Sequence, residues 1–494
     1  MFEAAEIPHS IPKQRFKTQM LQLRERLLDL QRDVMSRADF PVLILVNGLD
    51  AAGKGEAINQ INEWMDPRYI RTEAYGSSED RNSTRPEMWR YWKSLPPRGR
   101  IGILFGSWYS IPLAQRMSGR MKRRKFESRI ERTRHFERML AHEGALIVKL
   151  WFHLSRQDQH ARLTKLASDP LTAWRVSDRD WERFDAYDEF VRVASEIVRE
   201  TSTAEAPWHI IPGADENYRT LMVGELLANA MDARLKQSSS VNSFQPPPLP
   251  DLAIDSVDVL SALDYDAAVP ANRYKKALQK AQGALNQLTR HKKMAKHSLV
   301  LIFEGMDAAG KGSTIRRITQ ALDARFYRIV PIAAPTDEER AQPYLWRFWR
   351  NVPELGSAVI FDRSWYGRVL VERVEEFCSE SDWRRAYSEI NEFEKQLTED
   401  GAVVIKFWLA VTLDEQLKRF RERENTPHKR YKITDEDWRN RDRWPLYERA
   451  VCDMIEKTST EDSPWILVPS NDKKYARVRV LETIAERLES RFNA

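Results

Sequence analysis

The sequence predicts two α/β domains of similar shape in tandem, each a parallel sheet with helices on both faces. The octet GLDAAGKG at 48–55 recurs as GMDAAGKG at 305–312, and each copy follows an apolar run. The offset of 257 residues also relates MWRYWKSLP to LWRFWRNVP and PWHIIP to PWILVP, without an insertion. Within each copy, short apolar runs alternate with helical patterns, which is typical of a parallel sheet between two helical layers.

The expected elements follow the same order in both copies. In the second copy a charged helix leads into an apolar strand, the glycine loop and the helix of GSTIRRITQALD. A second strand, SAVIF, precedes further helices and a third strand, AVVIKFWLAVT; a charged helical stretch and a last strand, WILVP, complete the copy. We expect domains at 1–235 and 271–494, joined by a linker at 236–270 in which serine, proline and acidic residues dominate.

Composition excludes several classes of protein. The chain has 494 residues, of which 42% are hydrophobic, and its longest apolar runs are far shorter than the roughly 20 residues of a membrane span. Its first ten residues lack the basic and apolar stretches of a signal peptide. Two cysteines, Cys378 and Cys452, fit a reducing cytoplasm. We therefore expect a cytoplasmic protein without a membrane or nucleic-acid partner; the net charge of +6 permits a polyanionic partner.

The repeated octet has the pattern G-x-x-x-x-G-K between a strand and a helix, which predicts a phosphate-binding loop. Inward-turned N–H groups and the helix N-terminus bind phosphate oxygens, and Lys311, like Lys54, is placed to reach a transferred phosphate. The alternative is an ordinary glycine turn. The predicted phosphate-binding residues of this loop are Gly305, Ala308, Ala309, Gly310, Gly312 and Ser313.

Two carboxylates accompany the loop. Asp307 lies within it, and Asp362 ends the buried strand of VIFDRSWYGR. Both are candidate ligands of Mg²⁺, and Arg363 is placed to clamp a phosphate with its two-pronged donors. The alternatives are a helix cap for Asp307 and a structural Asp–Arg pair for Asp362 and Arg363.

A basic segment at 416–438 is the expected lid, which would close over anions and exclude water. The alternative is a solvated helix face with ion pairs to Glu422 and Glu424. The repeated WRFW is more typical of core packing than of a platform for a base. The basic residues of the segment are Arg419, Arg421, Arg423, Lys429, Arg430 and Lys432.

The two copies differ at the residues that chemistry requires. Asp362 and Arg363 correspond to Phe105 and Gly106, and Arg423 corresponds to Leu166. Losing a metal carboxylate removes several kcal/mol of transition-state stabilisation, so we expect the second copy to be catalytic and the first to be degenerate. The first copy has its own basic run at 116–129, which is either a track for a polyanion or a solvated helix face.

The motifs GMDAAGKGS, FDRSWYGR and the basic segment from Arg419 to Asp437 resemble the polyphosphate kinase 2 family. The duplication is similar to its two-domain class, the polyphosphate:AMP phosphotransferases. The resemblance implies a thymidylate-kinase-like P-loop fold and Mg²⁺-dependent transfer of a phosphoryl group from inorganic polyphosphate to AMP.

It also implies roles for single residues. Asp307 and Asp362 would arrange Mg²⁺ and the acceptor phosphate, Lys311 would bridge the two substrates, and Arg363 would hold the acceptor. Arg419, Arg423 and Lys432 would hold phosphates from the lid, and Lys429 belongs to the same cluster. The alternatives are an ATP-dependent nucleoside monophosphate kinase, a polyphosphate-driven ADP kinase and a non-catalytic polyphosphate-binding protein. No motif identifies the nucleobase, and a homo-oligomer is possible.

Overall fold

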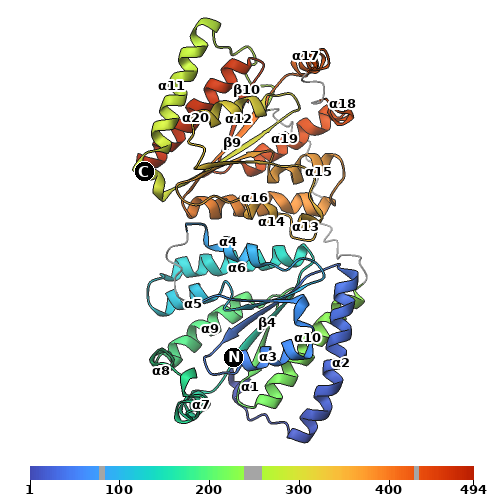
Figure 1. The fold of residues 1–494 in the computed structure, drawn as a ribbon, viewed down its shortest axis with the longest axis vertical. Helices are drawn as coiled ribbons and strands as arrows, with labels where there is room; N and C mark the ends of the chain where they lie inside the picture. Colours follow the sequence, from blue (N-terminus) through green and yellow to red (C-terminus); the bar gives the residue numbers. More distant parts are fainter. Residues whose placement is uncertain (77–83, 238–258, 428–432, 494) are drawn as a thin grey trace. The chain divides into compact units, whose positions relative to one another are not determined.

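The chain divides into two compact units, which a computed structural model describes over residues 1–76, 84–237, 259–427 and 433–493. One unit comprises Met1–Asn82, Arg90–Asn242 and Thr336–Trp346; the other comprises Ser83–Trp89, Ser243–Pro335 and Arg347–Ala494. Each contains one five-stranded parallel sheet with helices on both faces (Figure 1). The predicted fold class is confirmed. Residues 238–258 of the predicted linker lie outside the described residues.

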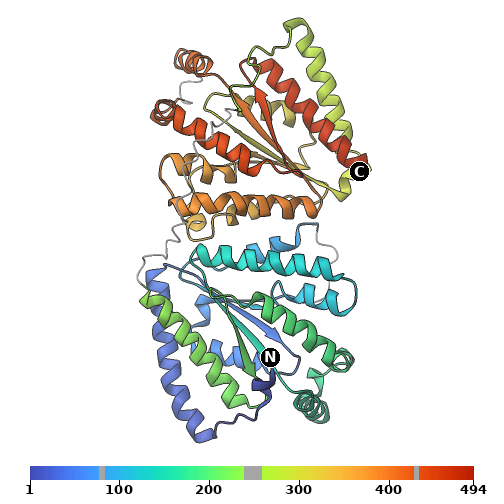
Figure 2. The same cartoon turned by 180° about the vertical axis from the view of Figure 1, so that it is seen from behind.

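The sheet of the first unit has the order β2-β3-β1-β4-β5, and every neighbouring pair is parallel. Its strands are β1 (Val42–Gly48), β2 (Ile70–Ala74), β3 (Ile101–Phe105), β4 (Leu146–His153) and β5 (Trp208–Pro212). One helical layer packs its apolar side chains on the sheet and comprises α2 (Lys13–Arg37), α3 (Lys54–Trp64) and α10 (Glu216–Lys236). Figure 2 shows α2 and α10 side by side. The opposite layer comprises α5 (Ser110–Met117), α6 (Arg123–His142) and α9 (Tyr187–Thr201).

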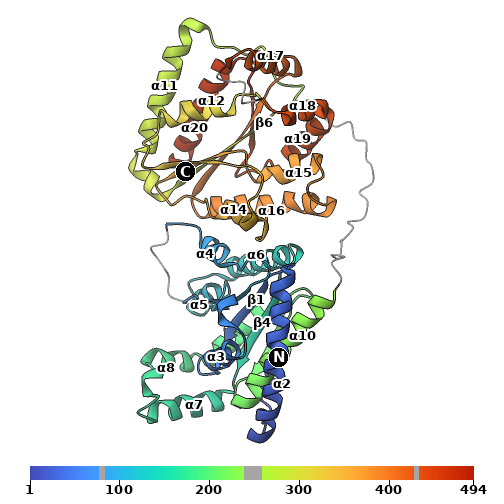
Figure 3. The same ribbon diagram turned by 45° about the vertical axis from the view of Figure 1, so that its right-hand side comes forward.

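The second unit repeats this design with the order β10-β9-β6-β8-β7. Its strands are β6 (Ser298–Gly305), β7 (Tyr327–Pro331), β8 (Ala358–Asp362), β9 (Ala402–Ala410) and β10 (Trp465–Pro469). One layer comprises α11 (Ala271–Thr289), α12 (Lys311–Thr319) and α20 (Lys473–Asn493) (Figure 3). The other comprises α15 (Val371–Val374), α16 (Glu380–Glu399), α19 (Trp444–Thr458) and the 3₁₀ turn η4 (Trp365–Val369).

The remaining helices are short or connect these layers. Within residues 1–237 they are α1 (Glu3–Glu6), η1 (Pro67–Tyr69), α4 (Glu87–Ser94), α7 (Arg156–Ser168), η2 (Ala173–Arg175) and α8 (Asp178–Asp185). From residue 259 onward they are η3 (Lys292–Lys296), α13 (Asp337–Arg340), α14 (Trp346–Trp349), α17 (Leu413–Glu424) and α18 (Asp435–Asp442). In the repeated aromatic motif, Phe348 and Trp349 are buried against Trp365 and Phe393, as core packing requires.

The sequence analysis identified four of the five strands in each sheet. The edge strands β2 and β7 were missed because their side chains are only partly buried, so neither IRTEA nor YRIVP has a continuous apolar run. Of the four identified strands in the first unit, β1, β3 and β4 are buried along almost their whole length. The fourth, β5, is buried at its first residue and at its last two residues. Partial burial at a sheet edge thus removes the hydrophobic signal on which strand prediction depends.

Glycine is required where the first strand of each unit meets its loop. Gly48 and Gly305 have φ of +127° and +148°, and a Cβ there would lie 2.1 Å from the Phe152 carbonyl oxygen or 2.5 Å from that of Leu409. Both oxygens belong to the neighbouring strand, β4 or β9, which cannot move aside. The strand and the loop can therefore approach this closely only without a side chain.

Neither cysteine forms a disulfide. Burial raises the pKa of the Cys378 thiol to about 12, so the thiol stays protonated and unreactive. No helix in the described part of the chain is both long enough and apolar enough to cross a membrane.

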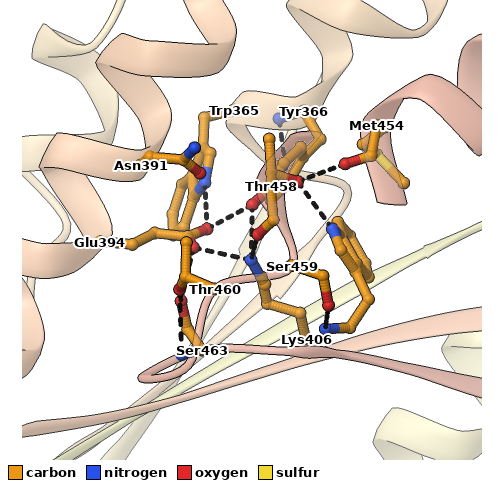
Figure 4. A network of polar contacts seen from close by, with 12 residues as sticks. Trp365, Tyr366, Asn391, Glu394, Lys406, Met454, Thr458, Ser459, Thr460 and Ser463 are labelled. Atoms are coloured by element: carbon orange, nitrogen blue, oxygen red, sulfur yellow. Dashed lines mark hydrogen bonds and ion pairs between the residues drawn. The ribbon is translucent and has the colours of Figure 1, made fainter. Parts of the chain in front are cut away.

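A buried lysine lies at the centre of the second unit (Figure 4). Lys406, on the interior strand β9, is 2.8 Å from Glu394 Oε2 on α16 and donates to the Thr458 carbonyl at 2.6 Å. Glu394 Oε1 accepts from Trp365 Nε1 at 2.9 Å and from Tyr366 Oη at 2.7 Å. The network therefore joins β9, α16, α19 and the segment that directly follows Asp362 and Arg363.

The first unit contains the same network. Lys149 lies 2.7 Å from Glu137 Oε2 and donates to the Thr201 carbonyl at 2.6 Å, while Trp108 and Tyr109 donate to Glu137. Because the first unit has this network without counterparts of Asp362 and Arg363, the network does not depend on those two residues. It is a structural anchor that both copies retain.

Replacing Glu394 with alanine leaves the buried ammonium of Lys406 without its carboxylate. We expect Glu394→Ala to lower the free energy of unfolding by about 3–5 kcal/mol, measured by urea denaturation of the full chain. The control is Glu380→Ala on the same helix, which breaks an exposed pair with Arg384 and costs at most about 1 kcal/mol. Equal losses in the two variants would contradict a central role for the buried pair.

Candidate active site

The glycine loop of the second unit connects β6 to α12. Gly310 caps the helix in the left-handed conformation with φ of 108°, and Ala308 also has a positive φ of 61°. Lys311, the first residue of the helix, donates through Nζ to the Gly305 carbonyl at 2.5 Å and to the Met306 carbonyl at 3.4 Å. Burial lowers the pKa of Lys311, and Arg363 lowers it further, whereas Asp307, Asp362 and Glu304 act in the opposite direction. The lysine is thus surrounded by the charged residues of one site.

The loop carboxylate Asp307 is held on both sides. Arg363 Nη2 lies 3.2 Å from its Oδ1, and Asn440 Nδ2 on α18 donates to its Oδ2 at 2.8 Å. Gln416 on α17 donates to the Asp307 backbone carbonyl at 3.0 Å. Asp307 and Arg363, two separately predicted site residues, therefore meet in space, and the amides of Asn440 and Gln416, which were not among the predicted site residues, hold Asp307 in place.

Asp362 lies at the carboxyl end of β8, in register with Phe303 of the adjacent strand β6. Among the residues that the structure describes, its carboxylate has no hydrogen-bond partner. Mg²⁺ is commonly bound by one or two carboxylates together with substrate phosphates and water. Asp307 and Asp362 fit that requirement, although no described group of three or more acidic, histidine or cysteine side chains could hold a metal alone.

Glu304 is a further buried acid that the sequence analysis missed. It precedes Gly305 on β6, is 5% exposed, and its Oε1 accepts from Ser364 Oγ at 2.8 Å. Burial raises its pKa, and nearby Lys311 opposes the shift. The first copy has Asn47 at this position, and there the direction of the bond is reversed, since Asn47 Nδ2 donates to Ser107 Oγ at 3.2 Å. An acid inside an apolar strand, replaced by an amide in the first copy, was the signal that could have identified Glu304.

Arg419 makes contacts other than the predicted ones. Its side chain is 2% exposed, and Nη1 donates to the Ala308 carbonyl at 2.9 Å, while Nη2 donates to the carbonyls of Ser470 and Asn471. Nε donates to Glu415 at 2.8 Å. Its donors therefore hold the loop to the end of β10 rather than facing outward toward a phosphate.

The other residues of the predicted lid are placed in part. Arg423 is half-buried on α17, and its charge lowers the pKa values of Arg419 and Lys473, whose largest shift comes from burial. Lys429, Arg430 and Lys432 lie outside the described residues. Ser313 donates through Oγ to the Gly310 carbonyl at 2.9 Å.

The first unit retains the loop but not its surroundings. Lys54 donates to the carbonyls of Gly48 and Leu49 at 2.8 and 2.6 Å, much as Lys311 does in the second unit. Asp50 forms an ion pair with Arg183 at 2.8 Å, where the second unit has the neutral Asn440. With Phe105 at the end of β3, the first unit has no counterpart of the Asp362 carboxylate at the carboxyl end of its sheet.

The family can be established at this point. The sequence model described as Polyphosphate kinase 2 matches residues 10–239 and 269–493. The chain belongs to the polyphosphate kinase 2 family. It is 50% identical over 493 residues to a Pseudomonas aeruginosa protein named polyphosphate:AMP phosphotransferase, covering 100% of this chain and 99% of the relative. A protein of the same name from Acinetobacter johnsonii is 38% identical over 476 residues, covering 95% and 96%.

A solved polyphosphate kinase 2 structure shares the whole fold. The crystal structure, from Pseudomonas aeruginosa, superposes with a TM-score of 0.90 at 48% identity, and the match covers 100% of this chain and 99% of that one. The family and the fold therefore extend over both units, including the unit without the second carboxylate.

The raised pKa of Glu304 predicts a specific dependence of stability on pH. Its contribution to stability is fully present below its ordinary value of 4.5 and is lost as the pH rises through the higher value of the folded state. The variant Glu304→Gln, which cannot ionise and can still accept from Ser364, should be the more stable protein at pH 7. The difference should disappear below pH 4.5.

Chemical denaturation at a series of pH values measures this difference. Glu482→Gln, at an exposed position on α20, is the control and should match the wild type throughout. A Glu304→Gln variant that is less stable at pH 7 would show that the ionised carboxylate contributes more through Lys311 than its burial costs.

Proposed function

We propose that the chain transfers the terminal phosphoryl group of inorganic polyphosphate to AMP, giving ADP, and that the second unit performs this reaction with Mg²⁺. The main support is the convergence of Asp307, Lys311, Asp362 and Arg363 at the carboxyl ends of the strands of the second sheet. The relatives that match over nearly the full length are named polyphosphate:AMP phosphotransferase, which supports this choice of donor and acceptor.

Each of these four side chains has a role in the proposed reaction. Asp307 and Asp362 would hold the metal, which would supply positive charge to neutralise the phosphates. Lys311 and the N–H groups of the loop hold the transferred phosphoryl group, and Arg363 holds the phosphate of AMP. Arg423, Lys429 and Lys432 would contact the polyphosphate chain; the two lysines lie outside the described residues.

The proposed reaction requires the AMP phosphate and the terminal phosphate of polyphosphate to be aligned and their negative charge to be stabilised. An oxygen of the AMP phosphate attacks the terminal phosphorus of polyphosphate; that P–O bond forms while the bond to the bridging oxygen breaks, and the shortened chain leaves. Because the attacking phosphate is already an anion, no general base is needed. The site therefore contributes orientation and stabilisation of charge in the transition state.

Arg419 and Asn440 act on this chemistry indirectly. Arg419 ties the loop to the residues after β10 through three carbonyls, which fixes the backbone N–H groups that face phosphate. Asn440 orients the Asp307 carboxylate without neutralising it, and Tyr447 in turn donates to Asn440 Oδ1 at 3.2 Å. Both are positioning residues.

Removing the carboxylate charge of Asp362 tests where catalysis occurs. We expect Asp362→Asn to lower the rate of ADP formation from AMP and polyphosphate by at least about 10²-fold, because a metal ligand is lost. The matched control, Asp50→Asn in the loop of the first unit, should retain nearly full activity. A loss from Asp50→Asn as large as that from Asp362→Asn would place the reaction in the first unit.

The same assay tests the donor and the acceptor. Polyphosphate and ATP are compared as donors with AMP and with ADP as acceptors. Product that forms only with ATP would contradict the proposed donor, and product that forms from ADP but not from AMP would contradict the proposed acceptor.

Introducing the residue of the first unit at position 440 tests the importance of a neutral partner for Asp307. In Asn440→Arg the guanidinium should pair with Asp307 as Arg183 pairs with Asp50, and compete with the metal. We expect kcat/KM to fall by about tenfold or more, or about 1.4 kcal/mol, and the Mg²⁺ concentration for half-maximal rate to rise. Arg183→Asn is the control and should leave both values unchanged; an unaltered Mg²⁺ requirement in Asn440→Arg would contradict the competition.

A further inference from the structure

Three arginines of the first unit converge on one carboxylate beside its loop. Glu56 lies in the first turn of α3, two residues after Lys54. Its Oε2 accepts from Arg162 on α7 at 2.5 Å and from Arg219 on α10 at 2.7 Å, and its Oε1 lies 3.8 Å from Arg175. Burial alone would raise the pKa of Glu56, but the three arginines lower it overall, so the carboxylate is ionised at neutral pH.

Arg219 is the most deeply buried member of this cluster. Its side chain is fully buried, and Nη1 donates to the Gly213 carbonyl at 2.8 Å. A Cβ at Gly53 would lie 2.2 Å from its Cζ, so the guanidinium packs directly against the phosphate loop. Its Nε has no hydrogen-bond partner among the described residues. Because α10 packs on α3, the charge of Arg219 is fixed at the loop (Figure 1).

The second unit has neither the carboxylate nor its buried partner. Ser313 stands at the position of Glu56, and Ala476 at that of Arg219. Arg419, the counterpart of Arg162, bonds instead to the carbonyls of Ala308, Ser470 and Asn471. The Glu56–Arg219 pair therefore belongs to the unit that lacks Asp362, and it occurs where a loop of this kind would otherwise meet an anionic ligand.

We propose that the first unit contains an anion site that is closed by one of its own side chains. The Glu56 carboxylate pairs with Arg162, Arg175 and Arg219, where a condensed phosphate would otherwise bind. In the wild-type chain this loop does not take up a phosphate chain. Removing the carboxylate charge opens the site to a phosphate chain.

Competition explains why one residue suffices. A phosphate chain that approaches this loop must displace Glu56 from two charge-assisted hydrogen bonds and also meets the repulsion of its charge. The carboxylate is tethered to the helix next to the arginines, so its effective concentration exceeds that of a free ligand. Without it, the three guanidinium groups and Lys54 lose a carboxylate that directly contacts the arginines; Asp50, at 3.8 Å from Lys54, and the more distant Asp180 and Glu216 remain as counter-charges.

The experiment measures binding of tripolyphosphate by calorimetry to full-length protein carrying Lys311→Ala, which silences the loop of the second unit. We expect no uptake that depends on Lys54 in this background. Adding Glu56→Ser should create one binding site per chain, with a dissociation constant for tripolyphosphate at least tenfold lower than in the Lys311→Ala protein. A further Lys54→Ala substitution should remove this site. Glu56→Gln, which keeps the length of the side chain and removes its charge, should also open the site.

Two results would overturn the proposal. The first is binding in the Lys311→Ala protein that Lys54→Ala abolishes, since the loop would then be open in the presence of Glu56. The second is the absence of new binding in both Glu56 variants when their circular dichroism and melting temperature match the parent. Neither result depends on the reaction of the second unit, so a failure of the proposed activity would be seen separately.

Discussion

The structure depends on a charge that cannot be left unpaired. Lys406 and Lys149 each place an ammonium group on an interior strand, where the side chain has no exposed surface, so a carboxylate and hydrogen-bond acceptors must surround it. Glu394 and Glu137 meet that requirement and also accept from the tryptophan and tyrosine after β8 or β3. In the second unit this contact fixes the chain two residues after Arg363. A buried ion pair thus sets the position of the segment that carries the proposed site residues Asp362 and Arg363.

The two units share a fold but differ in the charged side chains that pair beside their glycine loops. In the second unit the loop carboxylate Asp307 is held by Arg363 on one oxygen and by the neutral amide of Asn440 on the other. In the first unit Arg183 pairs with Asp50, and Glu56 pairs with Arg162 and Arg219. Without these carboxylates, the basic groups near the loop of the first unit would repel one another. Internal ion pairs therefore balance the charge there.

The sequence predicted the features that depend on local pattern. Fully buried strands give continuous apolar runs, and the loop with Asp362 and Arg363 forms a motif in consecutive residues. The edge strands β2 and β7, half exposed, gave no such run. Glu304, Gln416 and Asn440 were missed because their partners are distant in sequence and are known only from the fold. Arg419 was expected to bind phosphate, because a count of charges in a basic segment does not distinguish a buried arginine from an exposed one.

The balance of charge around Lys311 bears on the need for a metal. Asp307, Asp362 and Glu304 act on this lysine together with Arg363, so acidic and cationic groups lie close together around it. Carboxylates on their own repel phosphate. A divalent cation held by Asp307 and Asp362 would reverse the sign of the charge at these two carboxylates and would make them attractive to phosphates. Two acidic groups beside a phosphate loop, which are unfavourable in a simple anion site, therefore fit the proposed reaction, in which the phosphates would arrive with a metal. The first unit, with Phe105 in place of Asp362, lacks the second of these carboxylates.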